Sequence, residues 1–224
     1  HRDLHSFPTR RSSDLVGGQL YYPWPSVIAE VWRAPSAVCW HDIHTFPEWI
    51  MDLPVKPGFA HVSYEQAVRT AAELIPFLRS HAAAAELERR MPAAVTNELH
   101  RTGLIRALQP KTWGGMALKL SEWLCVLDKL GQGDLSVAWN VANLTLHHRT
   151  LALFSVQAQR EVWGENPDAL IAAGIAYVQG RARRVDGGLV ISGTWNFCSG
   201  VVGAGWNMLA CAVKDGADAK SKPV

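Results

Sequence analysis

The sequence predicts an α+β protein in which a helical part precedes a part made of strands. Between residues 63 and 165 apolar residues recur at helical spacing, and Ser, Pro and Gly stand where helices begin or end. After Pro167 the pattern changes to short apolar runs, and Asp186-Gly187-Gly188 between two of them is a strong hairpin signal. Helices followed by antiparallel strands are typical of an α+β arrangement.

Start and stop signals set the expected helix limits. Ser63 and Gln66 form a capping-box pattern, and Pro76 should kink or end the helix that begins there. Pro92 suits a first helical turn, and Gly103 suits a C-terminal stop. The expected helices are Ser63 to Pro76, Pro92 to Thr102, Ser121 to Leu130, Leu135 to Leu153 and one capped by Ser155, with a loop at Gln109 to Gly115.

The strands follow in the last quarter of the chain. They are expected at Ala169 to Ala176, Arg181 to Val185, Leu189 to Ser192 and Asn207 to Val213, before a polar tail from Asp215 to Val224. About four strands make a thin sheet, so we expect the β domain to be incomplete and the chain to be truncated at this end.

The composition is that of an ordinary globular chain. It is 48% hydrophobic and 19% charged, with a formal net charge of +2. No apolar run is long enough to span a bilayer, no secretory signal is visible, and the charge balance gives no electrostatic case for nucleic acid. Widely spaced cysteines without a C-x-x-C favour reduced thiols in a cytoplasmic protein: Cys39, Cys125, Cys198 and Cys211.

The first fifty residues are expected to lie outside the fold. Residues 5–15, HSFPTRRSSDL, resemble the translation of a common short-read sequencing adapter. Trp24, Trp32, Trp40 and Trp49 then stand among scattered prolines without a sustained period. His41 and His44 have loose metal-ligand spacing, but no cysteine or carboxylate cluster supports a metal site.

Met51 is therefore the expected start of the native protein. The domains expected are an adapter-like artefact at 1–15, non-native upstream translation at 16–50, a helical domain at 51–165 and an incomplete β domain at 166–224.

The stretch from Gly187 to Gly200, GGLVISGTWNFCSG, reads as a turn followed by a strand, with Trp195, Phe197 and Ser199 on one face. An aromatic ring and a hydroxyl two residues apart can contact a flat heterocycle together. The stretch resembles the flavin-contacting strand of the acyl-CoA dehydrogenase superfamily, and this resemblance implies that these three side chains bind the cofactor. An ordinary buried strand with a satisfied serine is the alternative.

Motifs in the helical part resemble the N-terminal domain of the same superfamily. They are Glu88-Arg-Arg-Met-Pro92, Thr102-Gly-Leu104, Pro110 with Gly114-Gly115, and Asp134-x-Ser136-x-x-Trp139. Their order continues into the flavin-contacting stretch, so the resemblance covers nearly everything from Ser63 to Asp215. It implies an all-α domain, an antiparallel β domain and a C-terminal four-helix bundle that is missing from this chain.

A polar stripe runs along the helix after Asp134, where Trp139, Asn143 and His147 recur every four residues. The helix resembles that of reduced-flavin-dependent monooxygenases with the acyl-CoA dehydrogenase fold, which include phenol and steroid-phenol hydroxylases and a dibenzothiophene monooxygenase. The resemblance implies a catalytic His147 near the flavin and substrate contacts by Trp139 and Asn143. A core histidine bonded to a backbone carbonyl is the alternative, and His148 lies off the stripe and is expected to be structural.

The resemblance implies the oxygenase component of a two-component monooxygenase. Such a protein takes reduced flavin, FMN or FAD, from a flavin reductase and uses O₂ to hydroxylate an aromatic or polycyclic substrate. His147 would assist proton handling, and Ser199 would hold the N5 edge of the flavin. A homotetramer is expected at full length, and the fragment itself is expected to be inactive.

Two other functions are left open. An FAD-dependent acyl-CoA dehydrogenase would carry a T-E-P-x-x-G-S-D-like loop, whereas Ala173 to Gly180 has neither that acid nor that serine. The departure argues against a CoA thioester as the substrate. It also removes the serine that some phenol hydroxylases use to hold the substrate hydroxyl, so a simple phenol is not established as the substrate either. A helical interaction module without a cofactor is the other alternative. Arg181, Arg183 and Arg184 are candidates for a flavin phosphate, or they form a solvated strand face.

Overall fold

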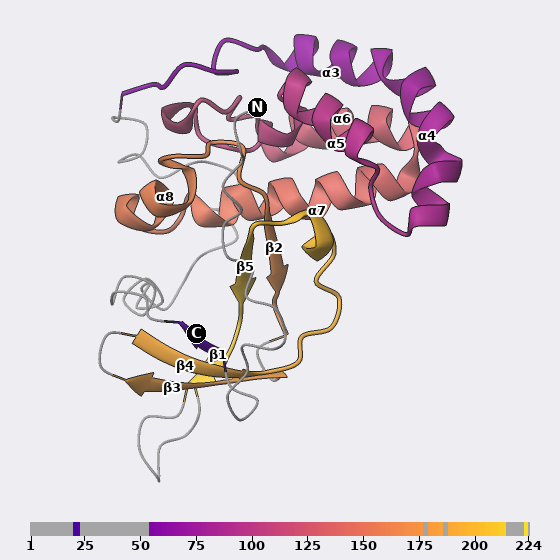
Figure 1. Ribbon diagram of the computed structural model, residues 1–224. Helices are drawn as coiled ribbons and strands as arrows, with labels where there is room; N and C mark the ends of the chain where they lie inside the picture. The colour runs from indigo at the N-terminus through magenta and orange to yellow at the C-terminus, as the bar shows by residue number, and fades with distance from the viewer. Residues whose placement is uncertain (1–19, 23–53, 177–178, 186–187, 214–221, 224) are drawn as a thin grey trace, which may run out of the picture.

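Helices and strands occupy opposite sides of the molecule (Figure 1). The computed structural model describes residues 20–22, 54–176, 179–185, 188–213 and 222–223. Its α-helices are α3 (Tyr64–Glu73), α4 (Ile75–Glu88), α5 (Ala93–Thr102), α6 (Leu120–Gly133), α7 (Leu135–Leu151) and α8 (Val156–Trp163). The α+β class predicted from the sequence is confirmed.

The helix limits follow local capping chemistry. The Ser63 Oγ accepts from the Gln66 N–H at 3.3 Å, and the Gln66 Oε1 accepts from the Ser63 N–H at 2.7 Å, which completes the predicted capping box. Gly103 ends α5 with a left-handed φ of 74°. Asp134 caps α7 through its Oδ1, which accepts from the N–H groups of Ser136 and Val137.

Helix α4 is the helix that the sequence pattern missed. Pro76 interrupts the helical run as predicted, but it does so by standing in the first turn of a new helix, where its missing N–H costs no hydrogen bond. Within α4, Leu78 is the buried residue. A single buried position gives little periodicity, and this explains why the pattern did not predict the helix.

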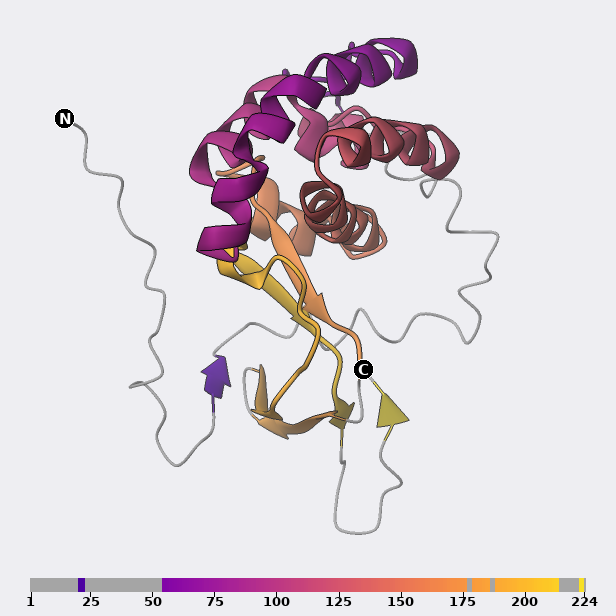
Figure 2. The same ribbon diagram turned by 90° about the vertical axis from the view of Figure 1, so that its right-hand side faces the viewer.

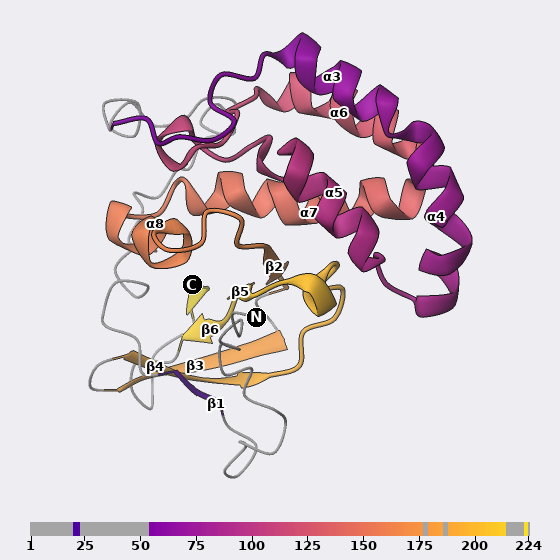
Figure 3. The same ribbon diagram turned by 45° about the horizontal axis from the view of Figure 1, so that its top comes forward.

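The main core lies among α3, α5, α6 and α7. Helix α6 contacts both α3 and α7, and Figure 3 shows it alongside α3. Fully buried aliphatic side chains fill the space between these helices, and each contributes about 2 kcal/mol by leaving water. The largest of them are Leu78, Leu99, Leu104, Ile105, Leu108, Leu130 and Leu144.

The strands form two small sheets. Strands β2 (Ile171–Gly174) and β5 (Trp206–Leu209) pair in parallel beneath α7, and Figure 2 shows them running from the helices toward the second sheet. The second sheet has the order β1-β4-β3-β6-β7. Its strands are β1 (Leu20–Tyr22), β3 (Gly180–Val185), β4 (Gly188–Gly193), β6 (Ala212–Val213) and β7 (Lys222–Pro223).

The predicted hairpin is confirmed, and the structure adds two parallel pairings that the expected antiparallel arrangement did not include. Strands β3 and β4 pair antiparallel with Val185 opposite Gly188. The apolar run from Asn207 to Val213 is divided between β5 in one sheet and β6 in the other, and both pair in parallel with an earlier strand. The divided run therefore links the two sheets.

The N-terminal predictions fall mostly outside the described residues. Residues 1–15, the histidines His41 and His44, Cys39 and the predicted start at Met51 all lie there. The exception is β1, which pairs antiparallel with β4 and places Leu20 opposite Ile191. Among the described residues, no helix is long and apolar enough to cross a membrane, and Cys125, Cys198 and Cys211 are free thiols.

Candidate functional site

The structure brings the polar stripe of α7 against the segment that follows β4. The Trp139 indole Nε1 donates to the Ser199 Oγ at 3.3 Å, although these residues are 60 positions apart. One residue further on, Gly200 lies so close to α7 that an added Cβ would be 2.9 Å from the Leu144 Cδ2. Two groups of residues predicted separately from the sequence thus lie side by side.

The prediction that Trp195, Phe197 and Ser199 share one face of a strand is wrong. Strand β4 ends at Gly193, and the residues after it form a loop and a turn. Phe197 has a left-handed φ of 62°, which breaks the two-residue alternation of a strand. The Ser199-Gly200 dipeptide is a turn signal that could have corrected the prediction.

Phe197 and Trp195 point into different surroundings. The Phe197 side chain is 96% exposed, so it makes almost no packing contact of its own. Trp195 instead packs against the small core of the second sheet, and its Nε1 donates to the Ala210 carbonyl at 2.8 Å. A left-handed conformation costs a residue such as Phe about 1 kcal/mol, so other contacts must hold this loop.

His147 has a fixed tautomer. Its Nδ1 lies 2.9 Å from the Ile171 carbonyl oxygen of β2, which can only accept, so Nδ1 carries the proton and Nε2 has a free lone pair. Burial lowers the pKa of His147, with a smaller opposing effect from the bond to Ile171. At neutral pH the ring is therefore neutral and has the form of a general base.

His148 contacts the same part of the chain from the buried side of α7. Its Nε2–H donates to the Ala169 carbonyl at 3.0 Å. Full burial lowers its pKa to about 4, so the ring stays neutral. This environment matches the structural role that the sequence predicts for it.

Exposed apolar side chains occur on the elements that form the contact between Trp139 and Ser199 and on the segment after β2. Trp139 is 63% exposed, and Asn143 turns its amide back to donate to the Trp139 carbonyl at 2.8 Å. The other large exposed apolar residues on α7, after β2 and in the β4–β5 connection are Leu135, Leu146, Ile175, Phe197, Val201 and Val202.

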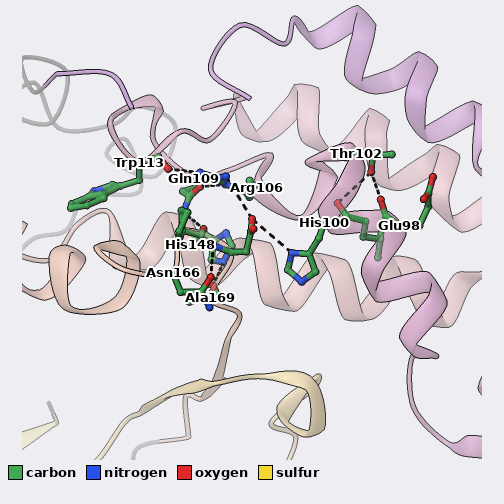
Figure 4. A network of polar contacts seen from close by, with 12 residues as sticks. Glu98, His100, Thr102, Arg106, Gln109, Trp113, His148, Asn166 and Ala169 are labelled. Carbon is green, nitrogen blue, oxygen red and sulfur yellow. Dashed lines mark hydrogen bonds and ion pairs between the residues drawn. The ribbon is translucent and has the colours of Figure 1, made fainter. Parts of the chain in front are cut away.

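The sequence reasoning missed a buried polar network centred on Arg106 (Figure 4). The Arg106 Nε donates to the Gln109 Oε1 at 2.6 Å, and its other nitrogens reach the Trp113 carbonyl and, at 3.6 Å, the Asp168 carboxylate. The His100 ring and the Arg106 guanidinium hold the pKa of Asp168 below its usual range. A single buried arginine has no sequence periodicity, so no pattern could have revealed this network.

The network attaches the connection before β2 to the helical layer. The Gln109 Nε2 donates to the Pro167 carbonyl at 2.8 Å, and the His100 Nδ1 lies 3.8 Å from the Asp168 Oδ1. Because Ala169 and Ile171 follow directly, the network also fixes the carbonyls that bind the two histidines of α7. The network therefore helps to hold His147 and His148 in position.

Two of the three arginines of β3 share a face, because successive residues of a strand point to opposite sides of the sheet. Arg181, Arg183 and Arg184 are exposed, while Ala182 between them is buried. Their contact with a flavin phosphate stays a prediction.

The helical part of the chain matches a known protein family. Residues 58–166 match the family model described as the N-terminal domain of acyl-CoA dehydrogenase. This region of the chain therefore belongs to that domain family, as the motifs of the helical part predict.

Among the proteins that this chain is similar to are oxygenase components of flavin-dependent monooxygenases. The chain is 37% identical over 144 residues to the oxygenase subunit HsaA of a flavin-dependent monooxygenase from Rhodococcus jostii, covering 64% of this chain and 37% of that protein. It is 35% identical over 164 residues to the oxygenase component of an FADH₂-dependent resorcinol hydroxylase from a Rhizobium species, covering 73% and 39%.

A solved structure agrees with these relatives. The crystal structure of the HsaA monooxygenase from M. tuberculosis superposes with a TM-score of 0.67 at 31% identity, over 72% of this chain and 44% of that one. The chain thus spans less than half the length of the relatives that it matches.

Proposed function

We propose that this chain is part of the oxygenase component of a two-component flavin-dependent monooxygenase that hydroxylates an aromatic or polycyclic substrate. Relatives that carry such names support the activity. The observation that carries the proposal is the hydrogen bond between Trp139 and Ser199, which holds the Ser199 hydroxyl beside the polar stripe of α7.

The residues present fit a flavin. The exposed Phe197 ring can lie against a flat ring system. The Ser199 Oγ accepts one bond from Trp139, and a hydroxyl that accepts one bond keeps its O–H and a second lone pair for a ligand. Ser199 can therefore donate to, or accept from, the N5 edge of a reduced FMN or FAD.

His147 supplies the acid–base group of the proposal. Reduced flavin, when bound, provides the electrons with which O₂ is activated. A phenolic substrate reacts faster as its hydroxyl loses a proton, and the free Nε2 of a neutral His147 can take that proton. Trp139 and Asn143, on the same stripe, are the proposed substrate contacts.

The exposed apolar residues on α7, after β2 and in the β4–β5 connection have a role in the same proposal. Once covered by a ligand or by protein, they exclude water from the reacting groups, and exclusion of water prevents the loss of oxidising equivalents as H₂O₂. A flavin reductase that supplies reduced flavin, an aromatic substrate and a homotetrameric assembly in the cytoplasm complete the proposal.

Oxygen incorporation tests this function against dehydrogenation. The protein that contains this chain is mixed with reduced FMN or FAD, a panel of phenols and ¹⁸O₂, and products are analysed by mass spectrometry. Incorporation of one ¹⁸O atom per product supports the proposal. In a parallel anaerobic reaction with oxidised FAD, reduction of the flavin by an acyl-CoA thioester, without hydroxylation of any phenol in the first mixture, would identify a dehydrogenase instead and refute the proposal.

A further inference from the structure

We propose that Trp195 is a positioning residue, which locks the loop carrying Phe197 and Ser199 onto the junction between the two sheets. The ligand that this loop meets is the flavin of the proposed function, and to that extent the inference rests on it. The loop's anchorage, however, is a property of the chain alone.

The indole of Trp195 occupies a slot lined by two glycines. An added Cβ on Gly174 of β2 would lie 2.7 Å from the Trp195 Cβ, and one on Gly180 of β3 would lie 2.3 Å from the indole Cζ2. Because both distances are shorter than any normal contact, only glycine leaves room for the ring at either position. The slot therefore takes one residue from each sheet.

A directional bond fixes the ring within this slot. The Trp195 Nε1 donates to the carbonyl of Ala210, one of the two residues between β5 and β6. The Ala210 N–H in turn donates to the Gly174 carbonyl at 2.9 Å. Trp195 is thus connected to the point where the chain passes from one sheet to the other.

The loop after Trp195 is held on both sides of its strained residue. On one side, the Asn196 N–H donates to the Gln179 Oε1 at 3.0 Å. On the other, Ser199 accepts from Trp139 on α7. Phe197 lies between these anchors with its left-handed φ of 62° and its exposed ring. Since its own ring contributes no packing, the anchors must maintain the conformation.

The consequence is a preorganised contact. A loop that samples several conformations presents the Phe197 ring and the Ser199 hydroxyl together for only a fraction of the time, and apparent affinity falls by that fraction. Trp195 removes this loss without contacting the ligand, which separates its role from that of Phe197.

Hydrogen exchange of the ligand-free chain tests the anchorage directly. Trp195→Ala should raise amide exchange at residues 196–200 by about 10-fold or more, because local opening becomes easier, while exchange in α7 stays unchanged. Trp195→Phe keeps a ring but loses the bond to Ala210, so it should raise the exchange by less. Trp163→Phe is the matched control, since Trp163 is fully buried in a different cluster. It should lower the melting temperature without affecting residues 196–200.

A pair of compensating substitutions keeps the test decisive even if a single variant fails to fold. Gly180→Ala should loosen the loop as Trp195→Ala does, and adding Trp195→Phe should restore part of the protection because phenylalanine has no Cζ2 atom at that position. Gly174→Ala should not be rescued in this way, since its conflict is with the Cβ that phenylalanine keeps.

Anaerobic titration with reduced FMN and FAD gives the functional reading. Weaker binding by about 10-fold together with faster exchange at 196–200 supports a positioning role. Weaker binding with unchanged exchange would show that Trp195 contacts the flavin itself, and unchanged exchange with unchanged binding would show that it holds nothing; either result overturns the inference. If the unmodified protein binds no flavin, the proposed function fails, while the exchange data still decide the anchorage.

Discussion

Ser199 and His147 offer different atoms to the proposed site. Ser199 presents a hydroxyl whose orientation is set by Trp139, and His147 presents an unprotonated Nε2 whose orientation is set by Ile171. In both cases the partner that orients the group comes from a distant part of the chain. Each role therefore predicts a different defect when its side chain is replaced.

Ser199→Ala should weaken the hold on reduced flavin. Loss of one buried hydrogen bond costs on the order of 1 kcal/mol, or roughly a fivefold weaker affinity. We also expect more H₂O₂ per flavin oxidised, which a peroxidase-coupled assay measures. Ser192→Ala on β4 is the control and should change neither quantity. Unchanged affinity and unchanged coupling in Ser199→Ala would rule out the assigned contact.

His147→Asn should separate catalysis from packing. The asparagine Nδ2 can replace the Nδ1–H donor to the Ile171 carbonyl, so the melting temperature should stay nearly constant. Hydroxylated product should nevertheless decrease by about 10²-fold, since a general base is lost. A variant that unfolds early but hydroxylates normally per folded molecule would assign His147 to the core instead.

How far the sequence predicts the site depends on the range of each interaction. The stripe of Trp139, Asn143 and His147 follows from the helical period alone, and the structure places all three on α7. Their partners Ser199 and Ile171 are 24 to 60 positions away and could not be derived from local spacing. The one-face arrangement of Trp195 and Phe197 failed because a single left-handed residue cancels the strand period.

At the scale of elements, the sequence predicted helix starts correctly where a side chain caps the helix. Ser63, Asp134 and Ser155 each accept from a backbone N–H at the start of their helices. The division of the Asn207 to Val213 run between β5 and β6 had no local signal, because both pieces are apolar. Which sheet each piece joins is decided by long-range pairing.

Ser63→Ala should destabilise α3 by removing the capping box. We expect the free energy of unfolding to decrease by about 1 kcal/mol, measured by urea denaturation. Ser121→Ala is the control, because Ser121 lies exposed within the first turn of α6 and does not occupy the cap position. An equal loss of stability in both variants would argue against a specific capping effect.

At the scale of the whole molecule, His148 makes stability depend on pH. The unfolded histidine binds a proton near pH 6.5, whereas the folded one binds it only near pH 4. Between these values the unfolded state binds more protons, so stability is complete above pH 6.5 and falls as the pH decreases. Each pKa unit corresponds to about 1.4 kcal/mol, so the loss amounts to a few kcal/mol.

His148→Gln should flatten this dependence between pH 6.5 and pH 4. Glutamine keeps an N–H donor for the Ala169 carbonyl but does not titrate. Urea denaturation at pH 7 and pH 4.5 measures the difference for both proteins. A variant whose stability falls as steeply as that of the unmodified protein would place the titration elsewhere, with His147 the next group, because burial lowers its pKa as well and stability then also falls below pH 6.5.

Removal of residues 1–50 tests the domain limits expected from the sequence. The family match begins at residue 58, and β1 adds three residues at the edge of one sheet. A chain that starts at Met51 should therefore melt at the same temperature or higher. A cooperative decrease in melting temperature would mean that the pairing of β1 with β4 is part of the stable fold.

The two adjacent histidines of α7 fix the rotational phase of that helix against β2. His147 and His148 bond to the carbonyls of Ile171 and Ala169, so each ring fits only one carbonyl. One residue inserted into α7 would rotate everything beyond it by about 100°, which would remove both bonds and turn the free Nε2 away from the stripe. Length variation in related genes should therefore fall at the exposed turn of Gly164 and Glu165, whereas α7 should keep its residue count.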